Sequence, residues 1–359
     1  MHRMYRFGIA GLTLALAAGA AADTITVALD GTGDYMDIQD AIDAAVDGDD
    51  VLVMPGTYWG VDLGWVFDTM GKLITVHSEQ GPEETIIDGQ GFHRGFVCRG
   101  GETADTVIDG FTFSGCFSYP VDIDGNGTLE WWDQCGGAAA IIYGDVTISN
   151  CHFINNTADG NGGAIGLLAY SAVTLDNCVF EDNSATWDGG AIFTTTWSPL
   201  TMTNCAVRNN TASGNGGAVK GGGSGAMSYT SCTVQGNTAG NEGGGLFLGS
   251  CPTSLSFTTV CGNSGEQIAS GDWDDVIGNI VTDVCPSLGA CCTTECVAQA
   301  SEADCLRFAG TWYGEGSTCA DIVCEGGGGS DCLGDVDGNN VVDVNDLLTI
   351  LSVYGDVCP

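Results

Sequence analysis

The sequence predicts an all-β solenoid, a chain that coils repeatedly about one axis and stacks short strands from coil to coil. A repeat of 27 residues in the middle of the chain is the first reason. The second is that glycine and asparagine separate short apolar stretches, with no helical periodicity between them. The recurring positions are Cys151, Cys178, Cys205 and Cys232; Asn156, Asn183, Asn210 and Asn237; and the glycine pairs that begin at Gly162, Gly189, Gly216 and Gly243.

Each repeat holds three strand-like stretches. The stretch Val146–Ile148 alternates apolar and small polar residues, which is the period of a half-buried strand. A second stretch is centred on Phe153, and a third follows the glycine pair. We expect equivalent residues to form columns along the axis, with Phe153 stacked on Phe180 inside. The asparagines of the Asn156 column can chain their side-chain amides from coil to coil.

These motifs resemble a known family. Phe153–Asn156 followed by Gly162–Ile165 resembles the repeats of right-handed parallel β-helix proteins, most closely the polymorphic outer-membrane-protein type in the pectin-lyase-like superfamily. Val27–Tyr58 resembles the opening of that superfamily, in which a short helix caps the first coil. The resemblance covers residues 24–284 and implies a fold that hosts lyases, hydrolases, adhesins and inert stalks. One apolar helical face is available for the cap: Ile38, Ala41, Ile42 and Ala45.

The N-terminus has the features of a secretory signal peptide. Arg3 and Arg6 precede an apolar stretch, Ile9–Ala18, and small residues at Ala20–Ala22. The apolar stretch is too short to cross a bilayer, and no later segment is apolar enough to span one. We therefore expect a secreted protein, extracellular or at the cell surface. The expected domains are a signal peptide 1–22, a β-helix 23–284 with an inserted segment 117–135, a cysteine-rich module 285–324, a Gly-rich linker 325–330 and a C-terminal module 331–359.

The chain is strongly acidic. Eight lysines and arginines face 46 aspartates and glutamates, which gives a formal net charge of −38. This charge argues against nucleic acid and anionic membranes as partners, and it disfavours direct binding of polyuronates unless a cation bridges them. Calcium binding and a merely solvated acidic surface both remain compatible with it. Glu181 and Arg208 occupy equivalent positions in adjacent repeats and predict an exposed ion pair of little energetic weight.

Eighteen cysteines in a chain expected to be exported predict disulfides. The four cysteines spaced by 27 form one interior column, compatible with bridges between coils or with buried free thiols. Cys116 and Cys135 flank the inserted segment and are expected to staple it. The segment 285–324 lacks histidine, so six closely spaced cysteines in it favour a three-disulfide module over a zinc site. They are Cys291, Cys292, Cys296, Cys305, Cys319 and Cys324.

The most specific chemistry lies in the C-terminal segment 335–346. Oxygen-bearing residues recur there at the spacing that curls six to eight ligands around one calcium ion. An acid at loop position twelve followed by a short apolar helix resembles a dockerin-type repeat, which implies calcium binding and a cohesin-like partner. Asn340 stands where that family has glycine, and one loop is present where dockerins have two, which weakens the cohesin implication. The expected ligands are Asp335, Asp337, Asn339, the carbonyl of Val341, Asp343 and Asp346.

A second calcium-loop pattern lies inside the inserted segment, with Gly127 at its tight turn. We expect a calcium-bound clip on one lateral face of the solenoid. An acidic turn without metal is the simpler alternative. The adjacent Trp131 and Trp132 could instead form a platform on which a sugar stacks. The expected ligands are Asp122, Asp124, Asn126, the carbonyl of Thr128, Glu130 and Asp133.

No motif identifies a catalytic site. One polar column could hold a metal or a sugar, although side chains facing water are the simpler interpretation. We expect a secreted calcium-binding protein with a structural, adhesive or glycan-binding role, and an extracellular polysaccharide or surface glycan as partner. The alternative is a polysaccharide lyase or glycoside hydrolase, which requires a lateral groove with two carboxylates or a bound calcium within reach of Lys220. The polar column consists of Asn161, Asp188, Asn215 and Glu242.

Overall fold

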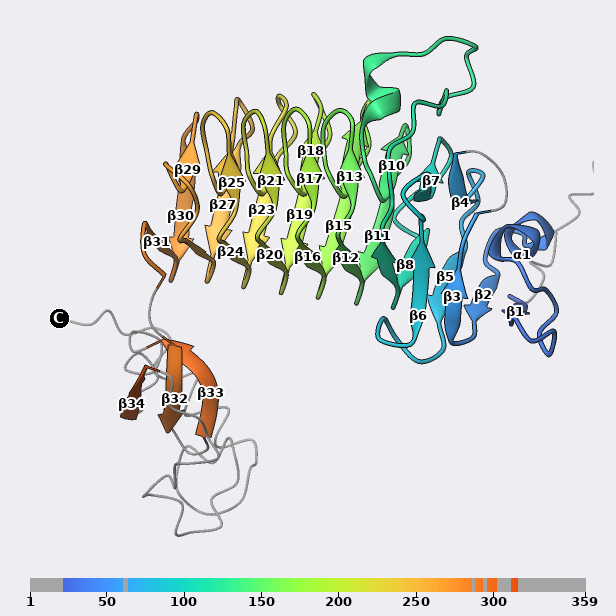
Figure 1. The fold of residues 1–359 in the computed structure, drawn as a ribbon, viewed down its shortest axis with the longest axis horizontal. Coiled ribbons are helices and arrows are strands. Elements are labelled where there is room, and N and C mark those ends of the chain that lie inside the picture. The colour runs from blue at the N-terminus through green and yellow to red at the C-terminus, as the bar shows by residue number, and fades with distance from the viewer. Residues whose placement is uncertain (1–21, 61–63, 286–287, 293–295, 302–310, 316–359) are drawn as a thin grey trace, which may run out of the picture. The chain divides into compact units, whose positions relative to one another are not determined.

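Short strands of successive repeats pair in parallel and in register, so the first part of the chain is a parallel β-helix (Figure 1). Val146 pairs with Val173, and Phe153 pairs with Phe180, which means that residues 27 apart lie side by side. Each 27-residue repeat is therefore one coil. Its strands hydrogen-bond to the coils before and after it, at the usual strand spacing of about 4.8 Å.

The computed structural model describes residues 22–60, 64–285, 288–292, 296–301 and 311–315. The chain divides into two units, Met1–Val284 and Cys285–Pro359. Four features predicted from the sequence lie wholly or largely outside the described residues: the signal peptide, the pairing in the cysteine-rich module, the Gly-rich linker and the C-terminal calcium loop.

Three long parallel sheets and one short sheet form the wall of the β-helix. The ten-stranded sheet contains β1 (Thr24–Val27), β2 (Asp50–Val53), β5 (Thr75–Ser78), β8 (Val107–Asp109), β11 (Val146–Ser149), β15 (Val173–Asp176), β19 (Leu200–Thr203), β23 (Met227–Thr230), β27 (Thr253–Ser256) and β30 (Trp273–Ile277). The nine-stranded sheet contains β3 (Gly56–Tyr58), β6 (Thr85–Asp88), β9 (Thr112–Ser114), β12 (His152–Ile154), β16 (Val179–Glu181), β20 (Ala206–Arg208), β24 (Thr233–Gln235), β28 (Thr259–Cys261) and β31 (Ile280–Thr282). The eight-stranded sheet contains β4 (Trp65–Asp68), β7 (Arg94–Cys98), β10 (Ala139–Ile142), β14 (Ile165–Leu168), β18 (Ile192–Thr194), β22 (Val219–Lys220), β26 (Leu246–Phe247) and β29 (Ile268–Ala269). Our sequence analysis did not predict the fourth sheet, although its strands repeat a Thr/Ser–Ala pair every 27 residues: β13 (Thr157–Ala158), β17 (Ser184–Ala185), β21 (Thr211–Ala212) and β25 (Thr238–Ala239).

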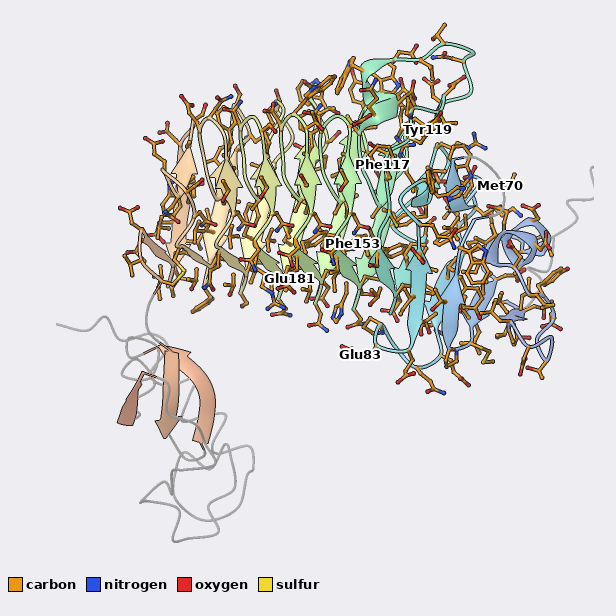
Figure 2. All side chains as sticks on the ribbon, viewed as in Figure 1. Met70, Glu83, Phe117, Tyr119, Phe153 and Glu181 are labelled. Atoms are coloured by element: carbon orange, nitrogen blue, oxygen red, sulfur yellow. The ribbon has the colours of Figure 1, made fainter. Side chains whose placement is uncertain are left out.

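Apolar side chains of successive coils stack in columns in the interior, and Figure 2 labels Phe153 of one such column. The rings of Phe153 and Phe180 stack 4.8 Å apart and nearly parallel, and Phe113 continues the stack on the other side of Phe153 at 4.9 Å. The predicted ion pair between Arg208 and Glu181 is present on the outside, with Nε 2.9 Å from the carboxylate. The 27-residue repeat thus predicts which side chains are neighbours, both in the interior and on the outside.

The asparagine column is a continuous chain of buried hydrogen bonds. The side-chain oxygen of Asn183 accepts from both the backbone N–H and the Nδ2 of Asn156, at 3.0 Å each. Asn183 Nδ2 in turn donates to the carbonyl of Phe153 at 2.9 Å and to Asn210 Oδ1. The same pattern continues to Asn237, and all these side chains are buried. Each amide satisfies backbone groups at a turn where no strand partner is available.

The four cysteines spaced by 27 are buried free thiols. The expected staple between Cys116 and Cys135 is wrong, because both are free. Cys116 belongs to the interior core, where its Sγ lies 3.6 Å from the carbonyl of Ser114. Cys135 belongs to a separate cluster on the outer side of the wall, with its Sγ 3.7 Å from the carbonyl of Trp131. The two sulfur atoms therefore sit in different environments.

A single α-helix, α1 (Ile38–Ala44), occurs among the described residues and contacts β1, β2 and β4. Asp37 caps its N-terminus by accepting from the backbone N–H of Gln39. Lys72 Nζ donates to the carbonyls of Ile42, Asp43 and Ala45 at 2.6, 3.0 and 2.8 Å. A cation at these carbonyls complements the negative end of the helix.

In the second unit the described residues form an antiparallel sheet in the order β33-β32-β34. Its strands are β32 (Leu288–Cys292), β33 (Cys296–Ser301) and β34 (Thr311–Glu315). Cys285, at the start of this unit, takes part in a disulfide bond.

We predict that Asn183→Ala lowers the free energy of unfolding by roughly 2 to 4 kcal/mol, because it removes the buried hydrogen bonds to the backbone N–H and Nδ2 of Asn156 and to the carbonyl of Phe153. Urea denaturation of the β-helix measures the change. Thr174→Ala, an exposed strand position on the same coil, is the control and should change stability by less than about 0.5 kcal/mol. Equal effects of the two substitutions would contradict the role of the asparagine column.

Candidate functional site

The outer face of the eight-stranded sheet is apolar, unlike a solvated sheet face. Val97, Ile142, Leu168 and Phe193 point outward from neighbouring strands and are nevertheless almost fully buried. The inserted segment covers part of this face, with Ile123, Cys135 and Trp132 packed against it. Figure 1 shows this insertion projecting from the coils next to β10. Strands of a parallel sheet that are covered on both faces are typically apolar throughout.

A fully buried arginine holds the inserted segment against the coils. Arg94, in β7, is 0% exposed, and it donates to the backbone carbonyls of Asp133, Cys135, Gly136 and Tyr119. Burial lowers the pKa of Arg94 to about 10, so the guanidinium remains charged at neutral pH. Carbonyl oxygens that converge on one guanidinium fix the base of the loop in a single geometry.

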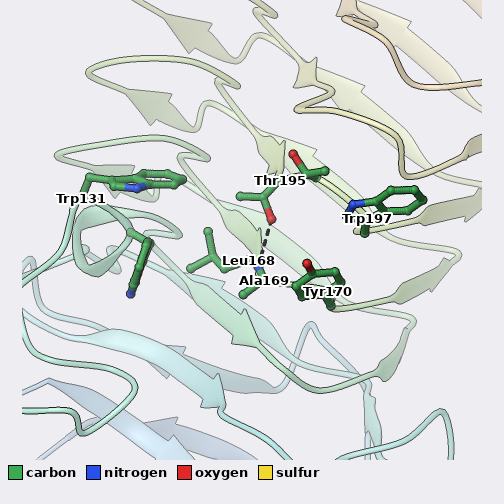
Figure 3. A pocket seen from close by; sticks show the side chains of 8 residues that line it. Trp131, Leu168, Ala169, Tyr170, Thr195 and Trp197 are labelled. Atoms are coloured by element: carbon green, nitrogen blue, oxygen red, sulfur yellow. Dashed lines mark hydrogen bonds between the residues drawn. The ribbon is translucent and has the colours of Figure 1, made fainter.

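Beside the insertion lies a trough with aromatic walls (Figure 3). Trp131 stands on one side, and Tyr170 and Trp197 stand on the other, with Leu168 and Ala169 between them. The hollow measures about 240 Å³. Trp131 and Trp132 belong to a short 3-10 helix, Trp131–Gln134, that the sequence did not predict. The lining residues are Trp131, Trp132, Leu168, Ala169, Tyr170, Thr195, Thr196 and Trp197.

The polar groups of the trough are uncharged. Thr195 Oγ1 accepts from the backbone N–H of Ala169 at 2.9 Å and lies 3.2 Å from Ser198 Oγ. Trp132 Nε1 is buried, and no acceptor among the described residues lies within hydrogen-bonding distance of it. Large aromatic surfaces with a few fixed polar groups are typical of small-molecule and sugar sites.

Tyr170 and Trp197 are site residues that our sequence reasoning missed. They are 67% and 57% exposed and lie 27 residues apart, and Tyr143 lies one repeat earlier. The signal was present, because all three stand three residues before the next strand of the ten-stranded sheet.

A cation–aromatic contact continues from the trough along the sheet. Trp131 meets Phe193 edge to face, with ring centroids 6.1 Å apart. Lys220 Nζ lies 4.8 Å from the centroid of Phe193 and 3.7 Å from a carboxylate oxygen of Asp188. Lys220 and Asp188, which we singled out from the sequence, are thus brought together at the edge of the same surface.

The predicted polar column is a ladder of side chains bound to backbone. Asn161 Oδ1 accepts from the N–H of Asp188, and Asp188 Oδ1 accepts from the N–H of Asn215 at 2.7 Å. Asn215 Oδ1 accepts from the N–H of Glu242, whose side chain is exposed. Asp188 and Glu242 do not contact each other because Asn215 lies between them. The column therefore provides no pair of adjacent carboxylates.

In the inserted loop, the side-chain amide of one predicted ligand, Asn126, binds two others, Asp124 and Glu130. Asn126 Nδ2 donates to Asp124 Oδ2 at 3.0 Å and to Glu130 Oε1 at 3.1 Å. The N–H of Gly127 donates to Asp122 and lowers the pKa of that carboxyl. Burial raises the pKa of Asp124, and the nearby charges of Glu130 and Asp122 add to the shift. Crowded carboxylates of this kind repel one another unless a cation or a proton intervenes.

Other features of the loop bear on whether calcium fits. Glu130 Oε2 is buried and has no hydrogen-bond partner among the described residues, which leaves one oxygen for a cation. Asp133 is fully buried, and its oxygens accept from the N–H groups of Ile123 and Glu130 at 3.0 and 2.6 Å. Thr128 Oγ1 lies within hydrogen-bonding distance of oxygens of both Glu130 and Asn126, and its single proton can be donated to one of them. In the part of the chain that is described, no group of three or more His, Cys, Asp or Glu side chains is arranged as a metal site.

Comparisons with known proteins agree with this architecture. A family model described as the right handed beta helix region matches residues 94–281, slightly more than half of the chain. The chain belongs to this family, and its fold is a right-handed parallel β-helix. No curated protein matches the sequence. No helix within the described ranges is long and apolar enough to cross a membrane.

Solved structures with a similar fold share little sequence with this chain. The pectate lyase Pel9A is 15% identical over 75% of this chain and 68% of its own, with a TM-score of 0.48. A pectin methylesterase from carrot is 14% identical over 73% and 88% of the two chains, with a TM-score of 0.40. The pectin methylesterase PemA from Erwinia chrysanthemi is 12% identical over 71% and 82%, with a TM-score of 0.36.

We predict that Arg94→Met loosens the inserted segment, because four backbone carbonyls lose their shared donor. Limited proteolysis should cut within residues 117–135 at least tenfold faster, and the free energy of unfolding should fall by about 3 kcal/mol. Arg208→Met removes an exposed arginine and is the matched control, with an expected loss below about 1 kcal/mol. An insertion that stays as resistant to protease as in the unaltered protein would refute this role of Arg94.

Proposed function

We propose that this protein binds a polysaccharide or surface glycan in the trough on the outer face of its eight-stranded sheet. The observation that carries the proposal is the pair of facing aromatic walls, with Trp131 on one side and Tyr170 and Trp197 on the other. Indole and phenol rings offer flat apolar faces to sugar C–H groups while their polar atoms reach hydroxyls. We further propose that the protein is exported and acts outside the cell, as its N-terminal sequence predicts.

The polar groups of the trough support a sugar ligand over a purely apolar one. The hydroxyls of Thr195, Thr196 and Tyr170 supply donors and acceptors along the trough. A glycan carries many hydroxyls that exchange water for such partners, whereas a purely apolar ligand would leave these groups without hydrogen bonds from the ligand.

Calcium is proposed as the ion of the inserted loop. The oxygens of Asp122, Asp124, Asn126 and Glu130 are hard ligands of the kind calcium prefers, and Glu130 Oε2 has no hydrogen-bond partner among the described groups. When bound, the ion supplies positive charge that offsets the repulsion between the carboxylates. The loop carries Trp131 and Trp132, so these ligands would order one wall of the trough.

The predictions for the C-terminal half remain proposals. The loop 335–346 is proposed to bind a second calcium ion, and the module that contains it to dock to a cohesin-like partner. The cysteines of segment 285–324 are proposed to form three disulfides. Helix α1 is proposed to cap the first coil, since it contacts β1, β2 and β4 and buries Ile38, Ala41 and Ile42.

A polysaccharide lyase or hydrolase is the second candidate, and one contact favours it. Lys220 and Asp188 form a partly buried pair beside Phe193, which touches the tryptophan wall. A lysine next to a sugar site could remove a proton from a bound glycan. Release of unsaturated or reducing ends by the unaltered protein, and its loss in Lys220→Met, would establish this activity in addition to binding.

We predict that Trp131→Ala and Trp197→Asn each weaken glycan binding about fivefold to tenfold, because each removes one aromatic wall. Trp197 has a left-handed backbone, which asparagine tolerates. Affinity electrophoresis in gels that contain neutral or acidic polysaccharides measures the effect. Trp187→Ala is the control, since Trp187 is 43% exposed and does not line the trough. Equal retardation of all four proteins would refute the trough as the binding site.

We predict that the full chain binds two calcium ions and that chelation lowers its melting temperature. Asp122→Asn with Asp124→Asn should remove one ion, and Asp335→Ala with Asp337→Ala should remove the other, because each pair supplies the first ligands of one loop. Isothermal titration calorimetry gives the stoichiometry. Asp182→Asn, an exposed aspartate in a turn, is the control. Unchanged stoichiometry in either double variant would refute the corresponding loop.

A further inference from the structure

Three exposed aromatic residues occupy the same turn on successive coils. Tyr143, Tyr170 and Trp197 follow β10, β14 and β18 of the eight-stranded sheet, and each lies three residues before the next strand of the ten-stranded sheet. They are 55%, 67% and 57% exposed. Two of them form one wall of the trough, and Tyr143 lies on the coil next to Tyr170, outside the hollow.

All three residues have a left-handed backbone conformation, with φ of 56°, 66° and 63°. This region disfavours bulky side chains, and glycine or asparagine is the residue that a turn of this kind prefers. An exposed ring adds little to folding, so stability does not explain why large aromatic residues stand here. Backbone strain that is not offset by packing of the side chain is typical of functional positions.

The coil spacing sets the distance between these rings. Neighbouring coils of a parallel sheet lie about 4.8 Å apart, so the rings recur along the axis in steps of one coil. A ligand in the trough meets Tyr170 and Trp197, which line it, and it reaches Tyr143 when it continues along the axis to the preceding coil. We propose, on the basis of the proposed glycan function, that the ligand is a linear, uncharged glycan chain bound parallel to the axis across these three coils.

The charges around the aromatic line favour an uncharged chain. The trough lining contains no charged residue. Beside Tyr143, Asp145 accepts from the N–H of Ala172 at 2.8 Å, which places a carboxylate on this turn. Lys220 is paired with Asp188. With a net charge of −38 on the whole chain, a polyuronate would meet repulsion and find no cation in the lining.

Tyr143→Asn tests the inference, because asparagine tolerates the left-handed backbone while the ring is lost. The probes are β-1,4-linked oligomers of glucose, xylose and mannose, from two to six units, and oligogalacturonates of the same lengths. Isothermal titration calorimetry measures each affinity. Affinity should rise with the length of a neutral oligomer, and Tyr143→Asn should weaken the longest about fivefold while leaving the two-unit oligomer unchanged.

Phe257→Asn is the matched control, since Phe257 is an exposed aromatic residue with φ of 50° on a different turn. If Trp197→Asn loses binding and Tyr143→Asn does not, the hypothesis of a glycan chain bound along the axis is wrong, while the glycan site in the trough is supported. Tighter binding of oligogalacturonates than of neutral oligomers would overturn the uncharged ligand. If the folded, unaltered protein binds none of the four oligomer series, both the axial binding of a glycan and the proposed glycan-binding function are wrong.

Discussion

The structure depends on one constraint, the register that the buried asparagine column imposes. Each amide must reach the next coil to satisfy backbone groups that have no other partner, as Asn183 does for Asn156. A coil one residue longer at this corner would leave several polar groups buried and unpaired. The aromatic stack on Phe153 obeys the same register, so hydrogen bonding and packing select one period together. Additional residues are tolerated only where the chain leaves the wall.

That constraint explains where the candidate site lies. The inserted segment leaves the wall between β9 and β10 and returns without disturbing the pairing of β10 with β14. It then covers apolar side chains on the outer face of the eight-stranded sheet, and Arg94 fixes its base by binding carbonyls instead of a carboxylate. The trough is formed between this segment and the turns of the next two coils. The site therefore consists of turns and an insertion, while the register of the core remains intact.

The sequence predicted the parts of the molecule that follow from periodicity. The 27-residue spacing placed Phe153 against Phe180 and Glu181 against Arg208, because residues in one column become neighbours in any stacked coil. It failed for Cys116 and Cys135, since closeness in sequence does not reveal which side of the wall a side chain faces. The trough could not be predicted either, because its two walls come from the insertion and from turns that only the folded coil brings together. The sequence showed that the inserted loop is acidic and contains glycine. It did not show that Asp133 is buried and accepts from backbone N–H groups of the loop.

The charge distribution gives a physical reason why this surface is suited to a glycan. The chain is so acidic that a site of ordinary composition on it would carry carboxylates and repel most anionic ligands. The trough instead lacks charge, and the acidic groups of the neighbouring loop bond to one another through Asn126. An uncharged polymer with many hydroxyls is not repelled by the surrounding field, and it can meet rings on successive coils without any change in the core. A solenoid with a fixed period thus offers a repeating surface, and under the proposed function the length of glycan bound would be set by the number of coils that carry a ring.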